Sequence, residues 1–598
     1  MRPARYRFSF PQPSTHLIHV ELSFRTHSQR SRLWMPAWTP GSYLIREYAR
    51  NIRTIAATGP DGPIAVEKIG KDEWQVVTQP GVDVLVRYTV YAHELSVRTA
   101  HHDGTHAYLH PAQVYLLSAD HAGGHFELAL ELPPGWTCAT LLPRQHRPTA
   151  DLHGVIQLIA DDLDMLLDSP IEVGIMARYR VPEPARDTDV VVWGEPIDEA
   201  ILPKLARVVN TVERFWGHRP FEHYDFLLHH VVGATSGLEH KHGTVVGADP
   251  DALAADREPR AEAQQPSRPG DATLDFLELC AHELFHAWNG KRLRPNALGP
   301  FDYRKENYTR ELWIVEGLTS YYDALLCLRS GEMPIDAYLE RMSKAIARLE
   351  AVPGRLVHAL ADASFDAWIK LYRPQEDSAN ASVSYYLKGA LVGFSLDCWL
   401  RKIDPEGAGL DAFMRALYDL GAGERGYTLA QAEQLLERIA GAPLPSEITA
   451  LWRCPGELPF AQLSAIGLEL RRKEAPPGAV HLGFTSDERR GSLWVQTVEA
   501  GTPVEAAGLA PGDELIAVRG ADEQTARVRA PHLGRAFHHV RPGEPLCLLV
   551  SRRDRIVELG VGGLESKKGE PQLAKLAGPS EASKAGFQRW SEQPWDSR

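Results

Sequence analysis

The sequence predicts a multidomain α+β protein, and three observations support this prediction. In the first part of the 598-residue chain, apolar and polar residues alternate, as they do in half-buried strands. In the middle of the chain, apolar residues recur at helical spacing. Further on, Gly508 and Gly512 give the backbone freedom for a tight turn after a short helix. A chain of this length is expected to form several domains.

The N-terminal region is predicted to be a β-sheet domain. Apolar residues occupy every second position over residues 18–24, 82–90 and 126–132. This alternation places apolar side chains on one face of a sheet and polar side chains on the other. We therefore expect a half-exposed sheet over residues 1–175.

Four histidines gather within this domain: His101, His102, His106 and His110. Their number could suggest a metal site. The sequence shows no fixed ligand spacing and no carboxylate network around them. We therefore expect a polar loop here and no second metal.

The run from Leu274 to Asn289 is predicted to be a helix that is half buried. It contains no Pro or Gly, and Asp271 or Thr273 can cap its N-terminus. Its apolar residues recur at helical spacing, at positions 274, 277, 281 and 284. A second helix is expected to start at the capping box Thr428-x-x-Gln431 and to end at Gly441.

The first of these helices carries the pattern His282-Glu283-x-x-His286. Residues four apart share a helix face, so both imidazoles can bind one zinc ion. Zinc lowers the pKa of a bound water to about 7, and Glu283 can accept its proton. Such a pattern also arises by chance in a chain with 25 His. On a half-buried helix, however, two uncompensated imidazoles are costly.

A catalytic zinc usually has three protein ligands, and the third is expected on a downstream helix. Glu311 and Glu316 compete for this role. Apolar residues precede Glu316, whereas Glu311 follows Arg310 and is expected on a solvated face or in a salt bridge. The sequence therefore favours His282, His286 and Glu316 as ligands of one zinc per chain.

These motifs resemble a known family. The ligand pattern is that of gluzincin metallopeptidases, and residues 313–322 (WIVEGLTSYY) look like the third-ligand helix of zinc aminopeptidases. The string HELFHAWNGKRLRP over 282–295 resembles the glycyl aminopeptidase family, as does MPAWTPGSYLIREY over 35–48. The resemblance covers residues 1 to about 560. It implies a mostly helical, thermolysin-like catalytic domain followed by a PDZ domain.

Two more site residues are implied by the resemblance. Residues 236–240 (SGLEH) are similar to the strand with which aminopeptidases bind a substrate's free amino group, which puts Glu239 in that role. His240 stands where many relatives carry Asn. Tyr386 lies in a segment similar to the one whose Tyr donates to the oxyanion. Tyr385 is adjacent and points about 100° away on a helix, so only one of the two can face the zinc.

The segment 501–516 resembles a PDZ signature, and residues 481–484 (HLGF) resemble a carboxylate-binding loop. Such a loop captures a peptide C-terminus while the peptide adds to a sheet edge. A purely structural docking domain is the alternative. The expected division is 1–175 β-sheet domain, 176–460 catalytic domain, 461–560 PDZ domain and 561–598 poorly ordered tail. A mobile surface loop is expected at 250–270.

Bulk properties exclude some classes of protein. The net charge of −13 argues against non-specific nucleic-acid binding. The sequence contains no stretch of about 18 uncharged apolar residues, so no membrane span is expected. The N-terminus lacks the apolar core of a signal peptide. The six Cys form no Cys-x-x-Cys pair and are expected to be reduced thiols in the cytoplasm.

The sequence thus predicts a zinc aminopeptidase that acts on peptides with a free N-terminus. The resemblance implies a preference for Gly and Ala there. A zinc endopeptidase and a PDZ-based peptide-binding scaffold with weak activity are the alternatives. The physiological substrate, the PDZ ligand and the oligomeric state do not follow from the sequence.

Overall fold

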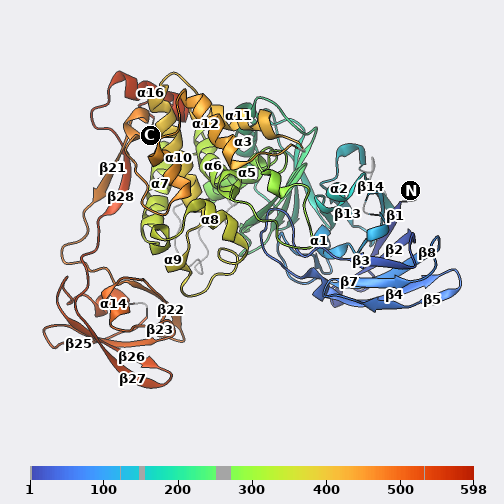
Figure 1. Ribbon diagram of the computed structural model, residues 1–598, viewed down its shortest axis with the longest axis horizontal. Coiled ribbons are helices and arrows are strands. Elements are labelled where there is room, and N and C mark those ends of the chain that lie inside the picture. Colours follow the sequence, from blue (N-terminus) through green and yellow to red (C-terminus); the bar gives the residue numbers. More distant parts are fainter. Residues whose placement is uncertain are drawn as a thin grey trace. The chain divides into compact units, whose positions relative to one another are not determined.

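The computed structural model describes residues 3–121, 123–146, 155–250, 271–423, 425–530 and 532–597 (Figure 1). The chain divides into two compact units. Unit 1 comprises Met1–Thr309, Tyr322–Met333 and Met414–Ala432, and unit 2 comprises Arg310–Tyr321, Pro334–Phe413 and Glu433–Arg598. The loop expected at 250–270 lies, except for its first residue, outside the described residues.

Unit 1 begins with the predicted β-sheet domain. Strands β2, β4, β5 and β8 lie side by side in Figure 1. They belong to a sheet with the order β14-β12-β1-β2-β8-β4-β5. Its strands are β1 (Ala4–Ser9), β2 (Leu17–Arg25), β4 (Ile52–Gly59), β5 (Gly62–Ile64), β8 (Asp83–Tyr91), β12 (Phe126–Glu131) and β14 (Val155–Ala160). A second sheet has the order β11-β3-β7-β6, with β3 (Arg30–Trp34), β6 (Val66–Lys68), β7 (Glu73–Val77) and β11 (Leu117–Ser118).

The alternation predicted for these strands is confirmed. In β2, Ile18, Val20 and Leu22 are buried, while the residues between them are partly exposed. The buried residues belong to one hydrophobic cluster that also takes in Leu33 and Trp74 of the second sheet. The core of the domain therefore involves both sheets.

The histidine cluster departs from its prediction. His101 and His102 form β9 (His101–His102), and His106 opens β10 (His106–Leu109), in a sheet with the order β13-β15-β10-β9. The other strands are β13 (Thr137–Thr140) and β15 (Ile171–Gly174). All four histidines are buried, so the expected polar loop is wrong. Burial, reinforced by the charge of His106, lowers the pKa of His101 to about 4, which keeps this ring neutral.

The later part of unit 1 is a sheet with helices against it. The strand order is β16-β17-β18-β20-β19, with β16 (Ala177–Arg180), β17 (Thr188–Gly194), β18 (Tyr224–His230), β19 (Ser236–His240) and β20 (Gly243–Ala248). Strands β17, β18 and β20 are parallel, and β19 pairs antiparallel with β20 at the edge. Helix α5 (Asp271–Phe285) packs against α3 (Ile201–Trp216), β19 and β20. This packing brings the predicted motif helix beside the edge strand.

Unit 2 contains most of the remaining helices. They are α7 (Ile335–Glu350), α8 (Leu360–Phe365), α9 (Ser378–Ala381), α10 (Tyr385–Ile403) and α13 (Ser446–Arg453). Helices α6 (Leu318–Arg329), α11 (Leu410–Gly421) and α12 (Leu429–Ala440) contribute residues to both units. The capping box at the start of α12 is confirmed: Thr428 N donates to Gln431 Oε1 at 2.9 Å, and Gln431 N donates to Thr428 Oγ1 at 3.2 Å.

A sheet with its own hydrophobic cluster follows the helices in unit 2. Strands β22, β23, β26 and β27 lie together with α14 in Figure 1. The order is β22-β23-β24-β26-β27, and β25 pairs with β24. The elements are β22 (Phe484–Arg489), β23 (Ser492–Val498), α14 (Pro503–Ala506), β24 (Glu514–Arg519), β25 (Thr525–Arg527), α15 (Leu533–Ala536), β26 (Leu546–Arg552) and β27 (Arg555–Val561).

The C-terminal segment corrects the prediction of a poorly ordered tail at 561–598. Strand β28 (Glu570–Lys575) pairs antiparallel with β21 (Leu468–Lys473). Helix α16 (Glu581–Ser591) buries Trp590, whose Nε1 donates to the hydroxyl of Tyr321 at 3.0 Å. The polar composition concealed these few large aromatic anchors. The division into two units does not test the bounds predicted for the other three domains, which stay predictions.

Among the described residues, no helix is both long and apolar enough to cross a lipid bilayer.

Candidate active site

Helix α5 carries His282, His286 follows its last residue Phe285, and hydrogen bonds fix both rings. The carboxylate of Asp323 accepts from His282 Nδ1 at 2.9 Å, and the carbonyl of Asn289 accepts from His286 Nδ1 at 2.8 Å. Because each Nδ1 is used as a donor, each neutral ring presents a lone pair at Nε2. The two Nε2 atoms face each other at 3.1 Å. A cation between them would relieve this repulsion, so the pair fits a metal ion such as zinc.

Glu283 lies against the edge strand β19. A Cβ at Gly237 would lie 2.0 Å from Glu283 Oε1, so only glycine leaves room for the carboxylate. Glu283 is 5% exposed, and its Oε2 has no hydrogen-bond partner among the described residues. Burial is the largest cause that raises the pKa of Glu283 to about 7. The charges of His282 and His286 lower this pKa, and Glu239 raises it further.

Glu239 of β19 is 7% exposed and lies near Glu283. The backbone of Gly41 packs against its carboxylate: a Cβ at Gly41 would lie 2.5 Å from Glu239 Oε2. Gly41 also has a φ of +91°, which favours glycine. Arg98 Nη2 donates to the carbonyl of Gly237 at 2.9 Å and so holds the same strand. Two buried carboxylates side by side make this region a suitable place for a cationic group.

Several of these residues carry no pattern that the sequence alone reveals. Asp323 follows two tyrosines downstream of the motif and gave no signal of its own. Gly41 lies in the string 35–48, whose glycine could have been recognised as a turn or close-approach position. Arg98 carried no pattern at all, because its partner, the Gly237 carbonyl, is 139 residues away.

In unit 2, Glu316 lies on a π-helix, Trp313–Gly317, and is 2% exposed. Such short π segments are frequent at functional sites. The next residue, Gly317, packs against α10 so closely that a Cβ would lie 2.6 Å from Gly389 Cα. Glu311 is partly exposed, and its carboxylate accepts from Arg310 N at 2.9 Å. The two candidate carboxylates thus have different surroundings.

Tyr386 and Tyr385 open helix α10 with stacked rings whose centroids are 4.6 Å apart. Tyr385 is fully buried, whereas Tyr386 is only partly buried. The hydroxyls of Tyr386 and Tyr372 lie 3.3 Å apart. Burial and the negative charge of Glu316 raise the pKa of Tyr386 well above its usual range, so the phenol keeps its proton. Tyr372 was not anticipated from the sequence.

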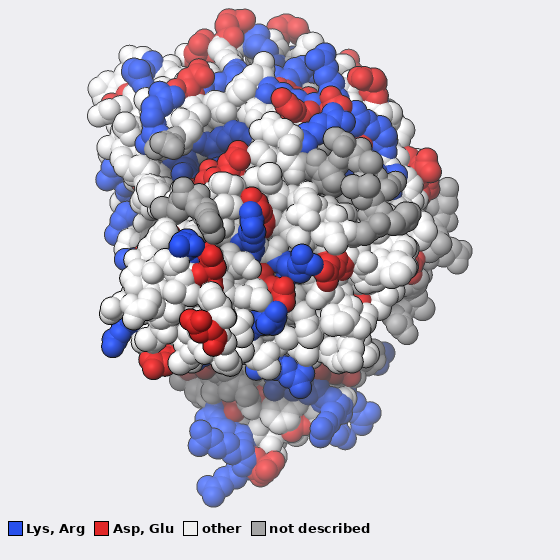
Figure 2. All heavy atoms as spheres, turned by 90° about the vertical axis from the view of Figure 1, so that its right-hand side faces the viewer, with Lys and Arg blue, Asp and Glu red and all other residues white. Residues whose placement is uncertain are grey.

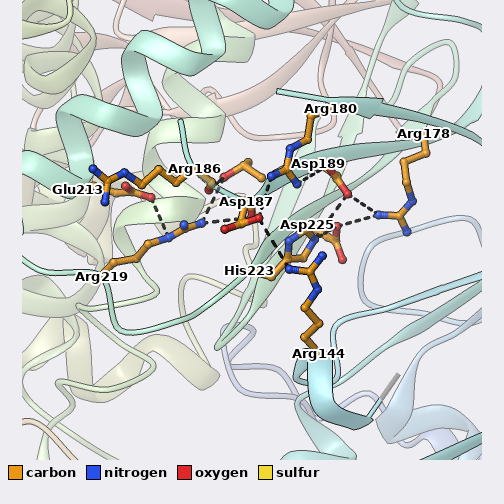
Figure 3. Close-up of polar contacts among 11 residues, drawn as sticks. Arg144, Arg178, Arg180, Arg186, Asp187, Asp189, Glu213, Arg219, His223 and Asp225 are labelled. Carbon is orange, nitrogen blue, oxygen red and sulfur yellow. Dashed lines mark hydrogen bonds and ion pairs between the residues drawn. The ribbon is translucent and has the colours of Figure 1, made fainter. Parts of the chain in front are cut away.

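A different group in unit 1 could also hold a metal: Asp189, His223 and Asp225. Figure 3 shows arginines pointing into it. Arg178 Nη1 lies 2.8 Å from Asp189 Oδ2 and 3.2 Å from Asp225 Oδ1, and Arg180 also contacts Asp189. The guanidinium groups supply the positive charge that a metal would bring, so this group is an ion-pair network.

Lys and Arg side chains are interspersed with Asp and Glu over the upper and middle parts of the face shown in Figure 2, and they predominate at its lower end. The mixture over most of this face, together with the net charge of −13, argues against an extended basic surface for nucleic acid there.

Comparison with known proteins supplies a family. Residues 275–392 match the model described as M61 glycyl aminopeptidase, and residues 5–175 match the Peptidase M61 N-terminal domain. The search of curated proteins gave no match.

The chain is also similar to solved structures of other proteins. An aminopeptidase N family protein from Idiomarina loihiensis is 28% identical, with a TM-score of 0.88, over 98% of this chain and 99% of that one. An M1 zinc metallopeptidase from Deinococcus radiodurans is 16% identical, with a TM-score of 0.45, over 77% of this chain and 95% of that one. Through these two matched regions, which include the motif helix, the chain is similar to the M61 glycyl aminopeptidase family of peptidases.

Proposed function

We propose that this protein is a zinc aminopeptidase that removes N-terminal residues from peptides. The observation that carries the proposal is the α5 histidine pair, whose Nε2 atoms face each other at 3.1 Å beside the buried carboxylate of Glu283. Two metal ligands and a general base within five residues are the minimal set for hydrolysis by an activated water. The family match supports the peptidase activity.

The proposed ligands of one catalytic zinc are His282, His286 and Glu316. Two imidazoles and one carboxylate form a common catalytic zinc set. Glu316 is preferred to Glu311 because it is the more deeply buried, on the π-helix. When bound, zinc would supply Lewis acidity toward water and the substrate carbonyl.

Glu283 acts as general base in this proposal. Its carboxylate takes a proton from the attacking water and later delivers a proton to the leaving amine. A carboxylate that is buried and has an unused oxygen is suited to this exchange, since no donor of the protein competes for that oxygen among the described residues. Tyr386 donates its phenolic proton to the carbonyl oxygen as negative charge develops there.

Glu239 is proposed to bind the substrate's free amino group. A buried carboxylate favours a cationic partner, and an ammonium offers three donors. The position of Gly41 against this carboxylate leaves it little freedom to turn away. The preference for Gly and Ala rests on the family resemblance.

Residues 461–560 are proposed to form a PDZ domain that binds a peptide C-terminus. Strand β22 is an edge strand of its sheet, as β-strand addition requires. It follows the loop 481–484, where Gly483 has a φ of +71° and its carbonyl accepts from Glu499 N at 2.8 Å. A β-sheet domain at 1–175, a catalytic domain at 176–460 and a cytoplasmic location complete the proposal.

Zinc removal and replacement test the proposal. Chelated protein should fail to cleave unblocked Gly and Ala dipeptide amides, and added zinc should restore cleavage. Restored cleavage of internal bonds in blocked peptides would favour a zinc endopeptidase. Zinc-loaded protein that binds peptide C-termini but cleaves nothing would favour a scaffold.

A further inference from the structure

We propose that the hairpin β9–β10 holds a second divalent transition metal, such as zinc, in unit 1. The ligands are His101 Nδ1, His106 Nε2 and a carboxylate oxygen of Asp103. The sequence predicted no metal here because no carboxylate network was visible around the histidines. The structure supplies two carboxylates, Asp103 within the hairpin and Glu172 behind it.

The geometry is close to that of a metal site. His101 Nδ1 and His106 Nε2 lie 2.8 Å apart, and these two atoms and an oxygen of Asp103 all lie within 4.8 Å of one another. With metal–nitrogen bonds of about 2.0–2.1 Å, tetrahedral ligand atoms are about 3.3–3.4 Å apart. An opening of the histidine pair by about half an ångström would therefore admit the ion.

A carboxylate orients the central ligand from behind. Glu172 Oε1 accepts from His106 Nδ1 at 2.6 Å, so the lone pair of His106 is at Nε2 and points toward His101. Glu172 Oε2 accepts from His229 Nε2 at 2.9 Å. The α5 site has the same arrangement, with Asp323 behind His282. Histidines that bind metals almost always have such an outer partner.

The remaining groups are fixed as well. Asp103 Oδ1 accepts from Thr105 N and Thr105 Oγ1, each at 2.7 Å, which leaves its other oxygen for a ligand role. The ring of Trp193 stacks on His106 with centroids 3.4 Å apart, and Trp193 Nε1 donates to Thr105 Oγ1 at 3.0 Å. The ligands are thus held in place before any ion binds.

The alternative is a hydrogen bond in which His101 donates to His106. That bond and the ion are mutually exclusive, because both use the Nε2 lone pair of His106. Without an ion, Asp103 Oδ1 still accepts from Thr105 and from His106 N, but its other oxygen has no role among the described residues. Glu172 lies on β15, in the same sheet as the hairpin, and also contacts His229 on β18 of a different sheet. An ion here would therefore connect the hairpin, through Glu172, to that second sheet, and the proposed role is structural.

Zinc stoichiometry of the full chain tests this inference. Zinc-saturated, desalted wild-type protein should contain two zinc ions per chain. Asp103→Asn and His101→Ala should each contain one. Asp103→Asn keeps an oxygen that accepts from Thr105, so its fold should persist, and circular dichroism checks this. His223→Gln, in the arginine-filled group, is the matched control and should keep two.

The outcomes also separate this inference from the proposed function, on which it does not depend. His282→Ala should lose one zinc and keep the other. A wild type with one zinc that His282→Ala removes and Asp103→Asn retains would overturn the hairpin site and leave the catalytic proposal standing. A wild type with one zinc that Asp103→Asn loses and His282→Ala retains would support the hairpin site and contradict a zinc site at the α5 histidines. A folded Asp103→Asn that retains two zinc ions would also overturn the hairpin site.

Discussion

Two histidine pairs in unit 1 invite comparison, one at the C-terminal end of helix α5 (the α5 pair) and one on the hairpin β9–β10. In both, ring nitrogens face each other at about the same distance, 3.1 Å for His282 and His286 and 2.8 Å for His101 and His106. In both, a carboxylate accepts a hydrogen bond from the opposite nitrogen of one ring. The two pairs differ in what lies beside them.

The α5 pair has Glu283 next to it, with an oxygen that no described donor uses. The hairpin pair has Trp193 stacked on one ring, and the nearby Asp103 already accepts several hydrogen bonds. A carboxylate with an unused oxygen can accept a proton from a water molecule. Around the hairpin pair the neighbouring groups already make contacts, which suits an ion that stays bound. We infer that the neighbours of a histidine pair, more than the pair itself, separate catalysis from structure.

The largest loss of activity is expected from a substitution of Glu283, the residue that distinguishes the α5 pair from the hairpin pair. Glu283→Gln should keep its zinc but lose about 10²–10⁴-fold in kcat, because the proton acceptor is gone. Asp275→Asn, at an exposed position of the same helix, is the control and should keep normal turnover. Kinetics on zinc-loaded proteins measure both. Near-normal turnover in Glu283→Gln would make the α5 pair no more catalytic than the hairpin pair.

The second effect concerns the oxyanion. Tyr386→Phe should lower kcat by about 10²–10³-fold with little change in KM, since the phenol acts on the transition state. Tyr385→Phe should lower kcat only slightly, because the ring of Tyr385 is fully buried. Steady-state kinetics of the two variants distinguish them. A larger loss in Tyr385→Phe would move the role to the neighbouring residue.

The third effect concerns the ligand set. Loss of a residue that only orients a metal ligand typically weakens metal binding by about 10–100-fold. Glu316→Gln removes a proposed ligand itself, so it should weaken zinc binding by more than this. Glu311→Gln should bind zinc as the wild type does. Competition with a chelator measures both affinities. If Glu311→Gln weakened zinc binding and Glu316→Gln did not, the proposed ligand assignment would be wrong.

The sequence could predict the α5 site because its parts are local. His282, Glu283 and His286 lie within five residues, and helical geometry alone brings the histidines together. The capping box at Thr428 and Gln431 was predictable for the same reason. Strand alternation likewise predicted the buried face of β2.

What the sequence could not predict depends on distant partners. Glu172 is 66 residues from His106, so the sequence alone predicts a polar loop at the hairpin histidines. Gly41 and Glu239 come from different strands and loops, and only their close approach reveals the pairing. In the C-terminal segment, a polar composition hid the burial of Trp590.

The smallest effect is expected at Gly41. Gly41→Ala should push the Glu239 carboxylate aside and raise KM for unblocked peptides, with less change in kcat. Gly62→Ala is the matched control, since Gly62 also has a positive φ, +115°, but a Cβ there meets nothing within 4 Å. Both variants carry the backbone strain of about 1–3 kcal/mol, so only the steric contact differs. Equal KM values for the Gly41→Ala and Gly62→Ala variants would show that Gly41 has no part in binding the substrate's amino group.

The most direct measurement compares kcat/KM for a Gly dipeptide amide and its N-acetylated form, in wild-type protein and in Glu239→Ala. An acetylated substrate leaves the buried Glu239 carboxylate without a cationic partner, a penalty of about 1–3 kcal/mol or more. We expect wild-type protein to cleave the free peptide and not the acetylated one, and Glu239→Ala to raise KM for the free peptide and narrow the gap. Efficient wild-type cleavage of acetylated peptides would contradict the assignment of an aminopeptidase.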